Sequence, residues 1–151
     1  MDHIRSLGVV IIVASFVAAC GEGASTQASA SSTAGSPVLT VDQLSGTWNL
    51  VSIQPAGQAD QATPAGASYT LTFADGRLST RVDCNMCSGT FTLSGQTLTA
   101  GPALACTRAA CPTMAFESGY TTLLSGENTV MLANNVLALS SARGVLRFTR
   151  Q

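Results

Sequence analysis

The sequence contains no lysine and only one histidine, His3. Charged residues of either sign make up 10% of its 151 residues, and the formal net charge is −1. Proteins that bind nucleic acid through its phosphates carry a basic patch or stripe. This composition has none, so nucleic acid is excluded as a partner.

The first 20 residues have the three parts of an export signal. Arg5 supplies positive charge, residues 7–19 are apolar, and the small residues Ala18 and Ala19 precede Cys20. This stretch is too short for a transmembrane helix, which needs about 20 apolar residues. The run VAACG around Cys20 resembles a bacterial lipoprotein signal, in which the cysteine becomes the lipid-bearing first residue of the mature protein. An ordinary secretory signal and a cytoplasmic protein with an apolar start are the alternatives.

We therefore expect residues 1–19 to be a signal peptide, residues 20–40 a lipidated cysteine with a flexible tether, and residues 41–151 the folded domain. The tether is dominated by Ser, Ala, Gly and Thr, which cannot build a core. Two or more acyl chains give stable membrane attachment where one does not. Gly21 after the cysteine, in place of Asp, favours the periplasmic side of the outer membrane in a host that has one. The predicted localisation is the bacterial cell envelope.

Removal of the signal would also remove His3. The mature protein would then have no catalytic histidine, no Ser-His-Asp triad and no histidine-ligated metal. Mechanisms that use only carboxylates or cysteines remain. We therefore predict a protein that is not an enzyme, with no catalytic residues, no metal and no cofactor.

The folded part shows the two-residue alternation of short strands. Residues 69–73 place Tyr, Leu and Phe on one face and Thr on the other. Asp75-Gly76 and Asn134-Asn135 are typical of tight turns between strands. Eight segments follow this pattern: 48–53, 69–73, 78–82, 90–93, 97–99, 130–132, 136–139 and 144–148. The pattern predicts a mainly β fold, as a meander sheet or small barrel.

Two segments depart from the strand pattern. Residues 112–125 have apolar side chains at helical spacing, with Pro112 in the first turn and Gly126 at the C-cap, so we expect one amphipathic helix over an end of the sheet. Gly119 in its middle costs about 1 kcal/mol of helix propensity. Residues 41–44 are expected to form a helical turn, and residues 54–67 a loop.

Four cysteines follow Cys20, in the order Cys84, Cys87, Cys106 and Cys111. In an exported domain an even count favours two structural disulfides, although spacing alone permits three connectivities. A Cys₄ zinc site and a redox-active C-x-x-C pair are the alternatives. A bridge between the two cysteine pairs would close a loop of roughly 20–28 residues and add about 3 kcal/mol.

Three pieces of the chain resemble the META domain, found in HslJ-like heat-inducible bacterial lipoproteins. They are residues 44–53 (LSGTWNLVSI), residues 83–89 (DCNMCSG), and residues 107–111 (TRAAC), the last followed by Phe116-Glu117 and Leu123-Leu124. The order and spacing of these pieces fit nearly the whole folded part.

The resemblance implies a lipocalin-like, antiparallel β fold of about eight strands with one helix. It also implies the disulfides Cys84–Cys111 and Cys87–Cys106, because Cys84 and Cys111 fall on the family's cysteine positions. One departure is Asp83, where the family often has Gly, so this loop could differ in shape. The family has no established biochemical activity.

We predict a non-enzymatic, lipid-anchored envelope protein, a stress-related or binding module for an unknown protein or small molecule. The candidate binding surface holds Asn85, Arg108 and Glu117. Each has a simpler interpretation: Asn85 bonding its own backbone in a turn, Arg108 paired with Asp83 or Glu117, and Glu117 as a surface residue of the first helical turn. A small inhibitor of a secreted protease or other hydrolase is the alternative function. An enzyme using Cys84 and Cys87, or Asp83 and Glu117, comes third.

Overall fold

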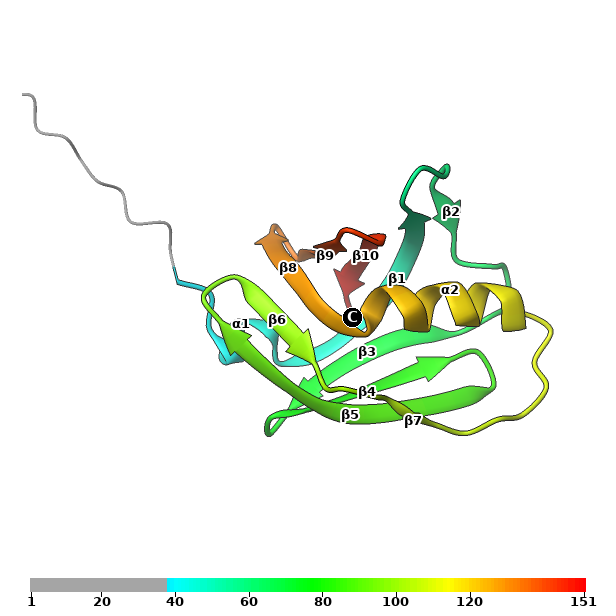
Figure 1. Cartoon of the computed structure of the whole chain (residues 1–151), viewed down its shortest axis with the longest axis horizontal. Helices are drawn as coiled ribbons and strands as arrows, with labels where there is room; N and C mark the ends of the chain where they lie inside the picture. The colour runs from blue at the N-terminus through cyan, green and yellow to red at the C-terminus, as the bar shows by residue number, and fades with distance from the viewer. Residues whose placement is uncertain (1–37) are drawn as a thin grey trace, which may run out of the picture. The chain divides into compact units, whose positions relative to one another are not determined.

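Alternating side chains from eight strands meet in one interior in the computed structural model, which describes residues 38–151. The strands are β1 (Gly46–Pro55), β3 (Tyr69–Ala74), β4 (Arg77–Val82), β5 (Asn85–Ser94), β6 (Thr97–Ala100), β8 (Gly126–Ala133), β9 (Val136–Ser141) and β10 (Gly144–Arg150). Neighbours in this order pair antiparallel, and β10 pairs with β1 to close the barrel (Figure 1). This up-and-down closure is the lipocalin arrangement. The predicted signal peptide, Cys20 and most of the tether lie outside the described residues.

Two short strands and two helices complete the described part of the chain. Strand β2 (Gln61–Ala62) pairs with β1, and β7 (Ala105–Cys106) pairs with β5. Helix α1 (Val41–Leu44) precedes the barrel, and α2 (Met114–Leu124) lies between β7 and β8 in the chain (Figure 1). No helix within residues 38–151 is long and apolar enough to cross a membrane.

The predicted eight strands, the helical turn at 41–44 and the two tight turns are confirmed. Asp75 and Gly76 have φ of 50° and 70°, and Asn134 and Asn135 have φ of 49° and 62°. Positive φ at both central residues gives a two-residue turn the twist of the strands it joins. Asp, Asn and Gly tolerate this conformation better than other residues, which is why these pairs were visible in the sequence.

Several boundaries differ from those predicted. Strand β5 begins at Asn85 rather than at residue 90, because residues 85–89 pair with β4 and alternate buried and exposed side chains. The loop at 54–67 contains strand β2. Helix α2 begins two residues later than expected, and Pro112 lies in the turn before it.

The barrel interior is filled by side chains from all eight strands and from both helices. The largest fully buried ones are Trp48, Tyr120, Phe73, Phe148, Leu44, Ile53, Leu71, Leu78, Leu98, Leu124, Leu137 and Leu139. Tyr120 enters from α2, and its hydroxyl lies 2.7 Å from that of Thr80, which in turn donates to the Thr70 carbonyl at 2.6 Å. The helix therefore belongs to the core and is not a loose cover.

Gly119 lets α2 approach the barrel wall closely. A Cβ at this position would lie 3.2 Å from Cδ1 of Ile53 on β1. Few Cβ contacts are that short, so a larger residue would push the helix outward. The propensity cost noted for this glycine is offset by the packing that it permits.

Candidate functional site

The residues predicted for the binding surface come together beside the start of β5. Asn85, Arg108 and Glu117 line one surface hollow of about 340 Å³, together with residues 106–110 and Met114. They come from three elements: β5, the segment after β7 and the first turn of α2. Barrel closure thus unites residues that lie up to 32 positions apart in the chain.

Asn85 fastens the segment after β7 to the barrel. It is 2% exposed; its Oδ1 accepts from the Ala109 amide at 2.7 Å and from the Thr107 hydroxyl at 2.9 Å. Its Nδ2 donates to the Ala109 carbonyl at 3.0 Å and to Glu117 Oε2 at 3.1 Å. The interpretation of Asn85 as a turn residue bonding its own backbone is therefore wrong. It is a tertiary anchor.

The bonds between Asn85 and Ala109 copy a β-ladder. Two residues of a hydrogen-bonded antiparallel pair exchange both N–H···O bonds. The primary amide of Asn85 makes the same two bonds with the main chain of Ala109. One step earlier, the Thr107 amide donates to the Met86 carbonyl at 2.9 Å. The pairing between β7 and β5 thus continues to residue 109, where the side chain of Asn85, the first residue of β5, takes the place of a main-chain partner.

Two disulfides hold the same segment. Cys87 and Cys106 face each other across β5 and β7, with their Cα atoms 4.0 Å apart. Cys84 joins Cys111 with a Cα separation of 5.8 Å. These are the two pairs that the family resemblance implies. Because all four sulfurs are bonded in this way, no free thiolates remain for a Cys₄ zinc site, and Cys84 and Cys87 do not pair with each other as a redox pair would. We call residues 105–111 the braced loop.

Arg108 is exposed near the middle of the braced loop. The predicted ion pair with Asp83 or Glu117 is wrong, because the one ion pair within residues 38–151 joins Arg147 to Asp60. Met114 lines the same hollow as Arg108 and Met86 lines a hollow with Thr107, and these methionines are exposed by 56% and 50%. Arginine and methionine are both enriched in protein interfaces.

Asp83 ties the turn before β5 to the start of α2. Its φ of 58° lies in the left-handed region that glycine adopts readily, so it takes a shape that the family's glycine would also take. Its Oδ2 accepts from the Thr113 hydroxyl at 2.8 Å, and the Tyr69 hydroxyl lies 2.8 Å from the same Thr113 oxygen. Burial raises the pKa of Tyr69, and the charges of Asp83 and Glu117 raise it further, against a lowering by the bond to Thr113. Because the Thr113 hydroxyl donates to Asp83, the Tyr69 hydroxyl is the donor in its bond to Thr113.

Glu117 is half-buried and accepts from Asn85, so it is more than a surface residue of the first helical turn. Within residues 38–151 no group of three or more His, Cys, Asp or Glu side chains is arranged to hold a metal ion. The polar side chains around the hollow are engaged mainly with the protein itself, and Arg108 is the charged group left facing solvent.

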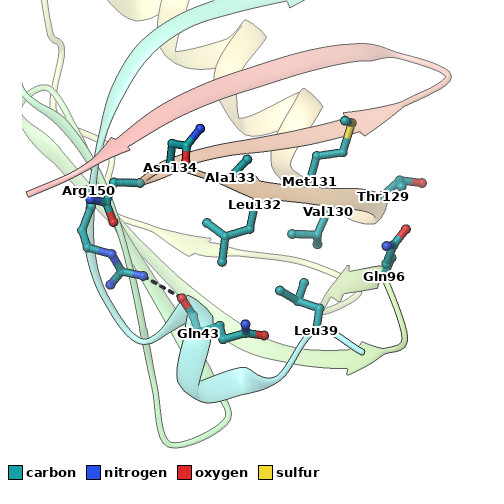
Figure 2. Close-up of a pocket in the computed structure, with 11 residues that line it drawn as sticks. Leu39, Gln43, Gln96, Thr129, Val130, Met131, Leu132, Ala133, Asn134 and Arg150 are labelled. Carbon is teal, nitrogen blue, oxygen red and sulfur yellow. Dashed lines mark hydrogen bonds between the residues drawn. The ribbon is translucent and has the colours of Figure 1, made fainter. Parts of the chain in front are cut away.

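A second hollow, of about 690 Å³, lies away from the braced loop (Figure 2). We call it the groove; it is lined by Leu39, Gln43, Gln96, residues 129–135 and Arg150. Figure 2 shows Leu39 facing Val130 and Leu132 of β8 across it. No sequence pattern marked the groove, because its lining comes from distant segments with ordinary strand alternation.

Arg150 forms one end of the groove. Its Nη1 donates to the Ser45 carbonyl at 2.8 Å and its Nη2 to the Gln43 carbonyl at 2.7 Å. The guanidinium carbon lies 4.1 Å from the centre of the Trp48 ring, a cation–π contact. Arg150 thus satisfies carbonyls at the end of α1, and its charge is already used by the protein.

The order and spacing of these features match a known family. Residues 41–151 match the META domain. The chain belongs to the META domain family. The META domain and its closed barrel support a binding or stress-related module. Among curated proteins, none matches the chain.

Solved structures similar to this META protein share its fold. A protein from Burkholderia xenovorans, solved by NMR, is 25% identical, covers 78% of this chain and 92% of its own, and has a TM-score of 0.62. A second NMR structure is 26% identical over 74% of this chain and 95% of its own, with a TM-score of 0.60. A DUF4847 family protein from Bacteroides vulgatus is 17% identical, covers 72% and 94%, and has a TM-score of 0.52. At that identity the likeness concerns the fold alone.

Proposed function

We propose that this META protein is a non-enzymatic, lipid-anchored protein of the bacterial cell envelope that binds a partner through the braced loop. Attachment would be through lipid on Cys20, and the tether would let the barrel reach away from the membrane. The partner class that the surface favours is a protein, because arginine and methionine are enriched in protein interfaces.

One observation supports binding most directly: several crosslinks hold an exposed segment that has no regular structure. Residues 107–111 have no helix, strand or turn of their own, yet two disulfides and Asn85 hold them. Binding costs less when a loop is already ordered in its bound shape. The bracing therefore suits a loop that presents Arg108 and its methionine neighbours to another molecule.

The filled interior argues against a lipocalin-like carrier role. Lipocalin barrels hold a small ligand when their interior leaves room for one. Here Trp48, Phe73, Phe148 and Tyr120 are fully buried in that space. Recognition through the outer surface is the use of the barrel that remains.

Photocrosslinking in intact cells tests the binding surface. A photoreactive amino acid at Ala110, beside Arg108, should give a discrete adduct that Arg108→Ala weakens. The same probe at Val51, which is 47% exposed on β1, is the matched control and should give none. An adduct from Met131 in the groove, with none from Ala110, would move the binding site and refute this proposal.

Detergent phase partition tests the anchor. The wild-type protein should enter the detergent phase of an envelope extract, and Cys20→Ser should move it to the aqueous phase. Equal partition of both proteins would exclude lipidation at Cys20 and leave the binding proposal to be judged by crosslinking alone.

A further inference from the structure

The braced loop begins as strand β7, is held to β5 along one edge, and leaves its other edge open. No turn or bend interrupts residues 103–111, and β7 pairs with β5 alone. The amides of Thr107 and Ala109 point toward β5, where they donate to Met86 and to Asn85. In an extended chain the residues between them direct their N–H and C=O groups the other way.

The open edge therefore belongs to Cys106, Arg108 and Ala110. Arg108 and Ala110 belong to no helix or strand, and their main-chain N–H and C=O groups have no hydrogen-bond partner within residues 38–151. An unpaired strand edge is a template for adding a strand from another protein. At the centre of this edge stands the exposed Arg108.

Secreted proteases offer a matching surface. They bind a substrate segment in extended form, pair with its main chain, and read the side chain before the cut bond in a specificity pocket. A pocket with an aspartate at its base selects arginine, as in trypsin. Arg108 has no ionic partner within residues 38–151, so an acidic pocket would supply one.

We propose that the braced loop docks as a substrate-like strand in the cleft of a secreted serine protease with arginine specificity, with Arg108 in the specificity pocket. This inference rests on the proposed function, because it names the partner class of the same loop. The protein would thereby inhibit the protease.

The bracing explains why the loop would resist cleavage. Attack by the protease serine on the Arg108 carbonyl carbon would break the bond to the Ala109 nitrogen, and the new amine would take up the proton. The Ala109 side would stay held by Asn85 and by Cys111, and the Arg108 side by Cys106. The amine would remain beside the acyl group and reform the bond, releasing the serine.

Inhibition assays with the full chain in detergent test this inference, with trypsin and chymotrypsin as probes. The wild type should inhibit trypsin and leave chymotrypsin unaffected. Arg108→Ala should weaken trypsin inhibition by about 100-fold or more, the loss expected of a central interface arginine. Arg108→Phe should transfer inhibition to chymotrypsin. Arg81→Ala, which changes another exposed arginine, is the matched control and should behave as wild type.

Two outcomes would overturn the inference. One is no inhibition of trypsin by the wild type, and the other is rapid cleavage after Arg108 as in an ordinary substrate. If either occurs while Ala110 still gives its adduct in cells, the loop binds a different partner and the proposed function stands. If the adduct is also missing, both proposals fall.

Discussion

The braced loop and the groove are two exposed surfaces of one barrel, and they are held in shape by different means. The braced loop has almost no regular structure and depends on two disulfides and a buried asparagine. The groove is built on regular strand β8 and helix α1, with apolar packing and one arginine. Figure 1 places the segment after β7 and helix α1 on opposite sides of the view.

The difference shows where crosslinks contribute most. A residue in a barrel strand is held by ladders on both sides, so a further constraint adds little. A loop such as 107–111 has a ladder on one side at most, and its conformational entropy must be removed by other means. Each of the two disulfides has one end in the braced loop, at Cys106 and at Cys111, and the other end at or just before the start of β5.

Removing either disulfide should lower the free energy of unfolding more than any other change to the braced loop or the groove. Each bridge closes a loop, with sequence separations of 19 and 27 residues, and the chain-entropy model assigns about 3 kcal/mol to loops of this size. Urea unfolding of Cys87→Ala/Cys106→Ala and of Cys84→Ala/Cys111→Ala should show this loss. Met131→Ser in the groove is the control and should change stability by under about 0.5 kcal/mol. A double variant as stable as the wild type would contradict the role given to the bridges.

Asn85→Ala should come second, with a loss of about 2 kcal/mol. It leaves the main chain of Ala109 and the Thr107 hydroxyl without their partner, and unsatisfied groups of this kind cost about 1–3 kcal/mol. Hydrogen exchange at the Ala109 amide should also become faster. Asn49→Ala on β1 is the matched control. Unchanged exchange at Ala109 would show that the disulfides alone hold the loop.

Arg150→Ala measures the same kind of support in the groove, and we expect about 1–2 kcal/mol. The substitution removes two hydrogen bonds to carbonyls near the surface and the contact with the buried Trp48 ring. Arg150→Lys should keep only part of this stability, because a lysine cannot span both carbonyls. Urea unfolding followed by Trp48 fluorescence checks both, with Arg77→Ala as control. A loss larger than that of Asn85→Ala would reverse the ranking of the two regions.

The smallest effect at neutral pH is electrostatic. Burial raises the pKa of Tyr120 far above its ordinary value of 10.0. The folded state then holds this proton to higher pH than the unfolded state does, so stability is full below about pH 10 and falls as pH rises beyond it. Unfolding measured between pH 8 and 11 should show this fall, and Tyr120→Phe should flatten it. An unchanged slope in Tyr120→Phe would assign the loss to other groups.

Much of the barrel could be predicted from the sequence, because strands and tight turns are local. The alternation at 69–73 and the pair Asn134-Asn135 depend on near neighbours alone. The sequence predicted the start of β5 too late, because local preference was misleading there. Residues 85–89 contain Asn, Gly and Ser, which favour loops when considered alone, but pairing with β4 overrides that preference.

The sequence predicted which residues lie together at the candidate site, but not the contacts that they make. Asn85, Arg108 and Glu117 do line one hollow, as the family motifs suggested. The sequence could not show that Asn85 pairs with Ala109, 24 residues away, or that Arg108 lacks an ion pair. Such contacts depend on where barrel closure puts the ends of the strands.

The sequence by itself determined the number of barrel strands, the turns between them, the helix that covers the core and the even set of cysteines. These follow from side-chain periodicity, turn chemistry and composition, which act over a few residues. Tertiary structure alone decided which surface is rigid and open. A hydrogen-bonded edge and a groove each require segments that are distant in the chain to meet at fixed spacing, and only the closed barrel sets that spacing.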